Sequence, residues 1–441
     1  MNTEKMIEVA RALGPIEAAL MDIARSLQLT PSMHDEATRR YEALARHVDR
    51  PGSPLEGDVD EVYPSGSFAI HAAIRSKIKR DQHDVDAVIE LVIPSETDPD
   101  LVLDRLYGAI VNTDDELYRG LTVERNSRCV TVHYSDGVTV DLMPVVRLPA
   151  TPERVSKLFH HKPESGEAYT KEINPDGFAR HFNQTVEISL EFARRFEARR
   201  LLVDGQLFAS NPVLVEKAAT QPMPEHMPLE RKSPRVVALQ LLKCFRDKRY
   251  RKHGDHAGQR KPPSVVMAAL ALDAPQVGAS LTDELLTVAT TMRDAIIEAD
   301  RHGRLLDVRN PAYLPDQFTD RWPEDREAQR LWAADLRHLV DELKELRREG
   351  FDPMRVKRVF DDLFGATIAD HVLKEHAKAQ NNAVLGGASQ MTPSGQLQSP
   401  ATSPRHPAIS GVMNAGGLGL GVGLITPVRA NTSMGGEIPD G

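Results

Sequence analysis

Apolar side chains recur at helical spacing through the first fifty residues. The spacing over residues 3–29 predicts a long amphipathic helix, and Gly14-Pro15 predicts a kink or break within it. A second helix is predicted over residues 31–48, before the turn residues Pro51-Gly52. The chain is therefore predicted to open with a helical segment, residues 1–50.

The pattern changes at Val59, where short β-rich runs begin to alternate with turn residues. One helix, near residues 101–111, interrupts these runs. Strands are predicted at 62–63, 85–93, 121–123, 129–133 and 138–143. Residues 51–175 are thus predicted to form a small mixed sheet with flanking helices.

From about Asp176 the pattern becomes almost wholly helical, which predicts a helical lobe over residues 176–379. Beyond about Gln380, Pro, Ser, Thr and Gly dominate and few residues are charged, so residues 380–441 are predicted to form a flexible tail. The fold class is α+β. Helices of the lobe are predicted at 178–200, 234–252, 263–272, 283–299, 326–346 and 354–363.

Composition narrows the class of protein. The 441 residues allow two or three domains, and 41% hydrophobic with 27% charged residues excludes wholesale disorder. A net charge of -9 and a pI near 6.0 disfavour a long nucleic acid as partner. Two cysteines, Cys129 and Cys244, cannot build a disulfide framework or a zinc ribbon. With no signal peptide and no run of about 20 apolar residues, we expect a cytoplasmic protein without a membrane span.

Two predicted strands carry aspartates on the side opposite their apolar residues. Strand alternation over residues 84–91 puts Asp84 and Asp86 on one face, and Asp141 lies on the polar face of residues 138–142. If the two strands are neighbours, three carboxylates converge, and they repel one another unless divalent cations lie between them. Because Mg²⁺ prefers oxygen ligands and substrate phosphates, this pattern predicts a two-metal site.

A Gly-Ser pair precedes these strands. Gly66-Ser67 follows the strand-like residues 61–63 and precedes the helix-compatible residues 68–74. Glycine lets backbone N–H groups approach a phosphate closely, and a helix N-terminus favours negative charge. We therefore predict that this turn holds a triphosphate.

The order of a Gly-Ser turn, an Asp-x-Asp strand and a later strand aspartate resembles the polymerase-β-like nucleotidyltransferase superfamily. Within it, the chain looks most similar to the bacterial cGAS/DncV-like nucleotidyltransferases, the CD-NTases of anti-phage CBASS systems. The matching segments span roughly residues 59–370. Three further stretches carry this narrower resemblance, Val138 to Pro144, Ser233 to Asp247, and Asn310-Pro311 with Phe318 to Trp322.

The resemblance implies a nucleotidyltransferase palm packed on a helical lobe and braced by the long N-terminal helix. It also implies that Asp84 and Asp86 bind two Mg²⁺ ions, for which Mn²⁺ can substitute, and that Asp141 contributes to the metal that activates the attacking ribose hydroxyl. That hydroxyl would attack the α-phosphate of an NTP and release pyrophosphate. A second round would close a cyclic di- or trinucleotide second messenger, through which the enzyme would reach a CBASS effector.

Two more residues are candidates for contact with the triphosphate. Lys243 either projects from its helix toward the β- and γ-phosphates, as a lysine of this helix does in relatives, or is a solvated helix lysine. Ser264 either contributes its hydroxyl to the triphosphate or is an ordinary helix N-cap. The basic residues between Arg231 and Lys261 are either a phosphate-facing groove or a solvated loop.

Two other functions fit the same residues. One is a transferase that adds nucleotides to RNA, a protein or a small molecule, and the other is a non-catalytic scaffold on a decayed transferase fold. The intact carboxylates and Gly-Ser pair argue against decay. The terminal Gly441 would suit conjugation by a ubiquitin-like ligase, as in some CBASS synthases, or the segment is simply a linker.

Overall fold

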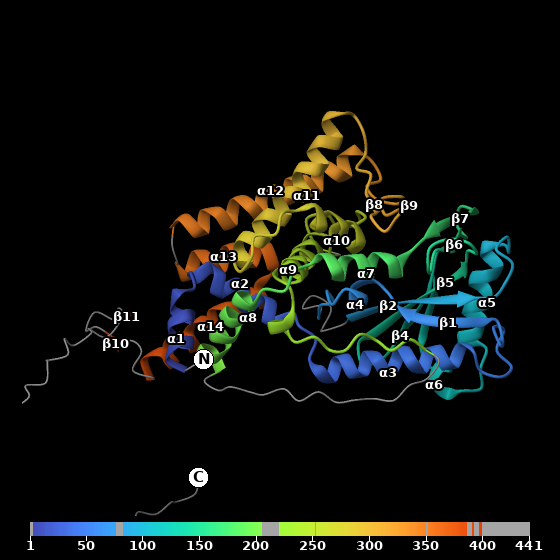
Figure 1. Ribbon diagram of the computed structural model, residues 1–441, viewed down its shortest axis with the longest axis horizontal. Helices are drawn as coiled ribbons and strands as arrows, with labels where there is room; N and C mark the ends of the chain where they lie inside the picture. The colour runs from blue at the N-terminus through green and yellow to red at the C-terminus, as the bar shows by residue number, and fades with distance from the viewer. Residues whose placement is uncertain are drawn as a thin grey trace, which may run out of the picture.

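The computed structural model describes residues 3–75, 83–204, 220–251, 253–349 and 352–385, and two short strands at 390–391 and 397–398. A seven-stranded sheet lies at one end of the molecule and a bundle of helices at the other (Figure 1). The fold class predicted from the sequence, α+β with a mixed sheet and a helical lobe, is confirmed. Most of the predicted tail, including Gly441, lies outside the described residues.

The sheet has the strand order β1-β2-β5-β4-β3, and a hairpin of β6 and β7 continues from β5. Strands β2 and β5 run parallel, and every other pair in this sheet is antiparallel. The bounds are β1 Val59–Pro64, β2 His83–Leu91, β3 Thr122–Arg125, β4 Val130–His133, β5 Val138–Arg147, β6 Ser156–Lys162 and β7 Glu167–Ile173.

One face of the sheet is covered by helices and forms a core. Helices α3 (Pro31–Val48) and α5 (Pro99–Val111) supply Leu44 and Leu106, which pack in one cluster with the alternate β2 residues Val85, Ala87 and Ile89. The short helix α6 (Glu116–Arg119) adds Tyr118 to the same cluster. Because strand side chains alternate between faces, the residues between these apolar positions point to the opposite side of the sheet.

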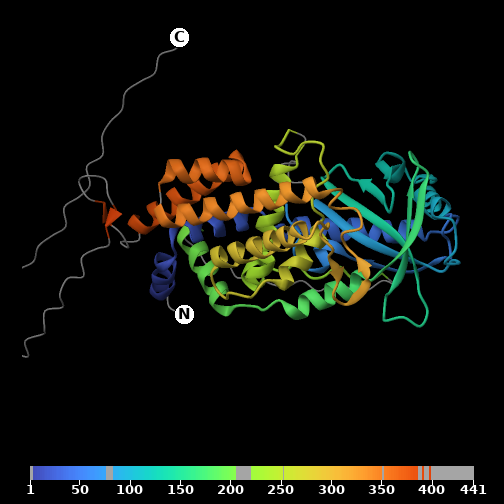
Figure 2. The ribbon, with the colours of Figure 1, turned by 90° about the horizontal axis from the view of Figure 1, so that it is seen from above.

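The helical lobe is built around α9, most of whose side chains are buried. Figure 2 shows its long helices lying alongside one another. Its helices are α7 Pro175–Thr185, α8 Leu190–Asp204, α9 Pro234–Arg249, α10 Ser264–Asp273, α11 Leu281–Arg301, α12 Arg326–Glu349, α13 Pro353–Phe364 and α14 Ala366–Leu385. The lobe also contains a 3₁₀ turn at Leu229–Arg231 and a two-stranded sheet of β8 (Arg309–Asn310) and β9 (Tyr313–Gln317). Within the described ranges, no helix is long and apolar enough to cross a membrane.

The N-terminal helices contact both parts of the molecule. The predicted break at Gly14-Pro15 is confirmed, because α1 (Thr3–Ala12) ends before it and α2 (Pro15–Ser26) begins at Pro15. Helix α2 packs in the same apolar cluster as α9 and α11, whereas α3 packs on the sheet. Helix α2 also reaches the sheet domain through its end, where the Leu27 carbonyl accepts a hydrogen bond of 2.8 Å from the Arg75 N–H.

Several elements differ from the prediction. In place of the helix expected over 68–74, the structure has the four-residue α4 (Gly66–Ala69). The hairpin β6–β7 was not predicted because β7 is mostly exposed and carries little apolar alternation. The single helix predicted over 178–200 is two helices, α7 and α8, and the Ser189 hydroxyl accepts from the Phe192 N–H at the start of α8. Helix α14, which was not predicted individually, continues past residue 380 to Leu385.

Candidate active site

The parallel pairing of β2 and β5 brings the three predicted aspartates to one face of the sheet. Asp86 lies opposite Asp141 in the register, and Asp84 lies opposite Thr139. Neighbouring strands are about 4.8 Å apart, so these side chains rise side by side from adjacent strands. The helix-covered face takes up Val85 and Ala87 instead. The two strands that carry the motif are therefore neighbours, as the sequence argument required.

The carboxylates disfavour one another's charge. The pKa of Asp86 is raised from 3.8 to about 7, first by desolvation and then by the charges of Asp141 and Asp84. The pKa of Asp141 is also raised, mainly by burial, with the charge of Asp84 adding to the effect and a hydrogen bond from Thr131 opposing it. A cation beside these groups would remove the repulsion, so the face is built to attract positive charge.

The donor set suits a hard divalent cation. It consists only of carboxylate oxygens, which Mg²⁺ and Mn²⁺ prefer, and it contains no nitrogen or sulfur ligand. Across the described ranges, however, no three His, Cys, Asp or Glu side chains are already placed to hold one ion. The residues fit the ion chemically, and small side-chain rotations would have to complete its coordination.

The predicted Gly-Ser turn is locked onto this face. It forms the first turn of α4 (Gly66–Ala69), directly after β1, and Gly66 has a left-handed φ of +56°. A Cβ at Gly66 would lie 2.0 Å from Asp86 Oδ2, so only glycine fits there. The Ser67 N–H donates to the Asp86 carboxylate, and the Ser65 N–H donates to the Asp86 carbonyl at 2.8 Å. The Gly66-Ser67 turn and Asp86, about twenty residues apart in the chain, are thus packed and hydrogen-bonded together.

Lys243 is buried between the lobe and the turn and is not a solvated helix lysine. Its Nζ donates a hydrogen bond of 2.9 Å to the carbonyl of Ala72, just beyond α4. Burial, and next the Arg246 charge, lower the pKa of Lys243 to about 8, while Asp86 and Asp84 act in the opposite direction. The lysine therefore lies within electrostatic reach of the carboxylates and brings a positive charge from α9 to the segment after the turn.

Ser264 is the first residue of α10 and does not cap it, so the N-cap interpretation is wrong. Its Oγ accepts a hydrogen bond of 2.9 Å from Arg246, which also donates to the Pro262 carbonyl at 2.9 Å and to Asp247. Asp247 also pairs with Lys261 at 3.0 Å. Several of the basic residues predicted as a groove or a solvated loop are thus paired with acidic neighbours in the lobe.

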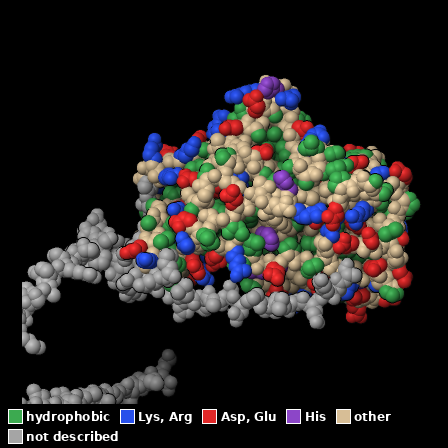
Figure 3. Space-filling model, viewed as in Figure 1, with side chains coloured by type: hydrophobic (Ala, Val, Ile, Leu, Met, Phe, Trp, Pro, Cys, Tyr) green, Lys and Arg blue, Asp and Glu red, His purple; other side chains and the backbone are tan. Residues whose placement is uncertain are grey.

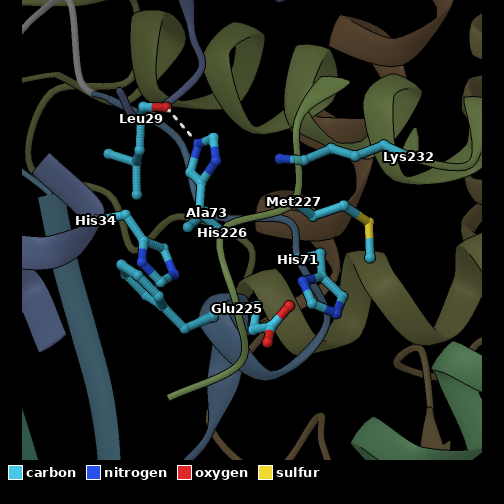
Figure 4. A pocket seen from close by; sticks show the side chains of 9 residues that line it. Leu29, His34, His71, Ala73, Glu225, His226, Met227 and Lys232 are labelled. Atoms are coloured by element: carbon cyan, nitrogen blue, oxygen red, sulfur yellow. Dashed lines mark hydrogen bonds between the residues drawn. The ribbon is translucent and has the colours of Figure 1, made fainter. Parts of the chain in front are cut away.

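A small cavity lies behind the turn. Figure 4 shows its lining, in which His34, His71 and His226 come from three different segments and Lys232 extends from the lobe. Its volume of about 30 Å³ suffices for one or two water molecules. Burial, and next the charge of Lys243, lower the pKa of Lys232 to about 7. The cavity is a packing defect beside the site and is too small for a nucleotide.

A chain of hydrogen bonds behind the turn was not visible in the sequence. Lys232 donates to Gln28 at 2.7 Å, Gln28 donates to Gln240 at 2.9 Å, and Gln240 donates to the Ala73 carbonyl at 2.7 Å. Together with Lys243 on Ala72, this chain ties the segment after the turn to α9 and to the end of α2. The only sequence signal was a glutamine within an otherwise apolar stretch of α9. Figure 3 shows that Lys and Arg side chains are interspersed with Asp and Glu side chains among hydrophobic and other surface on the visible face.

Comparison with known proteins gives a consistent result. Residues 15–159 match the Second Messenger Oligonucleotide or Dinucleotide Synthetase domain. The chain is 32% identical to the cyclic dinucleotide synthase CdnG of Bradyrhizobium diazoefficiens over 425 aligned residues. The alignment covers 96% of this chain and 95% of the relative. The structure of the Bradyrhizobium diazoefficiens CD-NTase CdnG in complex with GTP matches with a TM-score of 0.67 and 32% identity, over 82% of this chain and 98% of that one. A weaker likeness, with a TM-score of 0.48 and 14% identity over 78% and 94% of the two chains, is to the E. coli CdnC:HORMA-deltaN complex.

Proposed function

The chain belongs to the CD-NTase family of nucleotidyltransferases, and we propose that it joins nucleoside triphosphates into a cyclic di- or trinucleotide second messenger. The observation that carries the proposal is the parallel register that sets Asp86 beside Asp141, under a glycine turn locked onto Asp86. The cyclic dinucleotide synthase CdnG and its complex with GTP support the same substrate class.

The reaction we propose is a nucleotidyl transfer repeated within one site. A ribose hydroxyl of the acceptor attacks the α-phosphorus of the donor; the new O–P bond forms while the bond to the β-phosphate breaks, the hydroxyl proton is released and pyrophosphate leaves. The last transfer, within the linear product, closes the ring: it is the second transfer for a dinucleotide and the third for a trinucleotide. Since phosphoryl-group chemistry of this kind depends mostly on positioning and charge, the residues that matter are those that orient phosphates and neutralise charge.

We assign the metal ligands to the three aspartates. Asp84, Asp86 and Asp141 would hold two Mg²⁺ ions, or Mn²⁺ in their place, and the ions would supply charge neutralisation at the transferred phosphate and at the attacking hydroxyl. Their pKa values, raised at Asp86 and Asp141, support this assignment because bound cations relieve the same repulsion.

We assign the donor triphosphate to the side of the carboxylates on which the turn of Gly66 and Ser67 lies. Gly66 and Ser67 would approach the phosphates with their backbone, and Lys243 would supply a positive charge if the nucleotide draws it from the Ala72 carbonyl. Ser264 would add a hydroxyl that Arg246 already orients. The contacts of Gly66 and Ser67 with Asp86, and the electrostatic coupling of Lys243 to Asp86 and Asp84, support the first three roles. For Ser264 the support is its hydrogen bond from Arg246, whose charge in turn acts on Lys243.

We propose a cytoplasmic setting, in which the cyclic product reaches a CBASS effector and neither a membrane nor a long nucleic acid is a partner. A sequence with only two cysteines, Cys129 and Cys244, which are not paired with each other, supports that setting, and the net charge of -9 disfavours a long nucleic acid. Conjugation of the C-terminal Gly441 by a ubiquitin-like ligase stays a prediction that falls on residues beyond those described.

The test is an incubation of the full chain with all four NTPs and Mg²⁺ or Mn²⁺, followed by phosphatase and mass spectrometry. We expect a phosphatase-resistant product that is lost in Asp86→Ala. Release of pyrophosphate without a resistant product would show transfer to another acceptor instead. Turnover retained in Asp86→Ala would contradict the site, and no turnover at all would point to a missing activator or to the scaffold interpretation.

A further inference from the structure

Each of the three carboxylates receives a hydrogen bond from a neighbouring element. Ser67 donates to Asp86 through its backbone N–H. Thr139 Oγ1 lies 2.5 Å from Asp84 Oδ1, and Thr131 Oγ1 donates to Asp141 Oδ1. The two threonines lie on different strands, β5 and β4, and the sequence patterns had assigned neither of them to the site.

The sheet register explains these contacts. Thr139 lies opposite Asp84 in the parallel pair β2–β5, and Thr131 lies opposite Asp141 in the antiparallel pair β4–β5. Side chains opposite one another on the same face are about 5 Å apart at Cβ, close enough for a hydroxyl to reach a carboxylate. Threonine is also stiff about χ1, so its hydroxyl is held where the strand places it.

The two threonines differ in how their hydroxyl hydrogen is directed. The Asn126 side-chain amide donates to Thr131 Oγ1 at 2.8 Å, so that oxygen is an acceptor and its single hydrogen is left for Asp141. Asn126 is itself held by its N–H, which donates to the Cys129 carbonyl at 2.9 Å. Thr139 has no such fixed direction, because the His83 carbonyl, at 3.4 Å, is a second acceptor for the same hydrogen.

The hydrogen bond from Thr131 occupies one oxygen of Asp141 and leaves the other without a donor among the described residues. A carboxylate with one oxygen fixed in this way offers the second to a cation in a single orientation. Such outer contacts to metal ligands typically change metal affinity 10- to 100-fold when they are removed. The relay from Asn126 through Thr131 therefore has the geometry of a device that orients a metal ligand.

We propose that Thr131, oriented by Asn126, is a positioning residue that fixes Asp141 for binding a divalent cation. The inference rests on the proposed function of Asp141 as a metal ligand and adds the residues that set its orientation. Thr131 itself is buried and its hydroxyl is engaged by Asn126 and Asp141, so the role we propose for it acts through Asp141.

The test measures Mn²⁺ binding to the full chain by electron paramagnetic resonance, with a non-hydrolysable NTP analogue present so that no turnover occurs. Thr131→Val keeps the shape of the side chain and removes the hydroxyl, and we expect it to raise the Mn²⁺ dissociation constant at least about 10-fold. Thr131→Ser restores the hydroxyl, and we expect binding within about 2-fold of the wild type. Thr170→Val, on an exposed position of β7, is the matched control and should bind Mn²⁺ as the wild type does.

Asn126→Ala gives a second perturbation that leaves the strand intact, and we expect a smaller loss of Mn²⁺ affinity in the same direction. Wild-type affinity in a folded Thr131→Val, or an equal loss in Thr131→Ser, would overturn the positioning role. If Thr131→Val does not fold, wild-type affinity in Asn126→Ala overturns it. Asp141→Ala separates the two levels of the argument: wild-type affinity there would contradict Asp141 as a ligand, whereas reduced affinity there with unchanged Thr131→Val would contradict only the relay.

Discussion

Replacing Asp86 by asparagine is expected to make the metal-free protein more stable while it abolishes catalysis. The carboxylate is half-buried beside two others, and its pKa is raised from 3.8 to about 7. An acid whose pKa is raised on folding binds its proton more tightly in the folded state. The ionised form therefore costs stability, and this cost is absent below pH 3.8, grows as the pH rises and is complete above about pH 7.

The size of the effect follows from that shift. About three pKa units at roughly 1.4 kcal/mol each give a ceiling of about 4 kcal/mol at pH 8, and water access to the half-buried side chain lowers the expected value to about 2–4 kcal/mol. Integration of the same linkage leaves about two fifths of this cost at pH 5, where the folded-state carboxyl is protonated but the unfolded-state carboxyl is ionised.

The assay is urea unfolding in EDTA, followed by circular dichroism, at pH 8 and pH 5. We expect Asp86→Asn to unfold with a free energy about 2–4 kcal/mol above the wild type at pH 8 and with about two fifths of that gain at pH 5. Asp60→Asn, an exposed carboxylate of β1, should change stability by less than about 0.5 kcal/mol. Equal stabilities of Asp86→Asn and the wild type at pH 8 would refute the reasoning that burial and the neighbouring carboxylates disfavour the ionised form of Asp86.

Two further substitutions test the turn and the lobe. Gly66→Ala should abolish GTP binding, measured by calorimetry, and destabilise the fold by more than about 2 kcal/mol, because its Cβ would meet Asp86. The control Gly57→Ala has a φ of +77° but open space around it, so it carries only the backbone strain of about 1–2 kcal/mol and should leave GTP binding unchanged. Arg235→Met should lower the free energy of unfolding, measured in urea, by about 3–5 kcal/mol, since it leaves the buried Glu284 without its ion-pair partner. The double variant Arg235→Met with Glu284→Leu should recover part of that loss, and no recovery would contradict the pairing.

Local spacing was sufficient to predict most helices and the first strands. Residues 31–48 and 326–346 show apolar positions every three or four residues, and a helix that buries one face needs no other information to reveal itself. The hairpin β6–β7 was missed because its stability comes from pairing with β5 rather than from its own alternation. The break between α7 and α8 was missed for a similar reason, since the apolar period continues across it.

Some features of the candidate site were likewise predictable from local sequence, and others depended on tertiary contacts. That Asp84 and Asp86 share a face was predictable from residues 84–91 alone, because strand side chains alternate with a period of two. The sequence places Lys243 on a helix but does not show that it is buried, because its burial depends on the segment after α4 that covers it. The hydroxyls of Thr131 and Thr139 gave no local signal, because a threonine on a strand is common and only its partner across the sheet gives it a role.

The sequence by itself determined which residues could do chemistry: an acidic strand face, a third strand aspartate and a glycine turn, each encoded within a few neighbouring residues. Only the tertiary structure decided that β5 lies parallel to β2 with Asp141 beside Asp86, that Gly66 must have no side chain, and that Asn126 directs Thr131. The physical reason is that periodicity is a local property of the chain. Register, close approach and desolvation are set by contacts between segments that are tens to hundreds of residues apart.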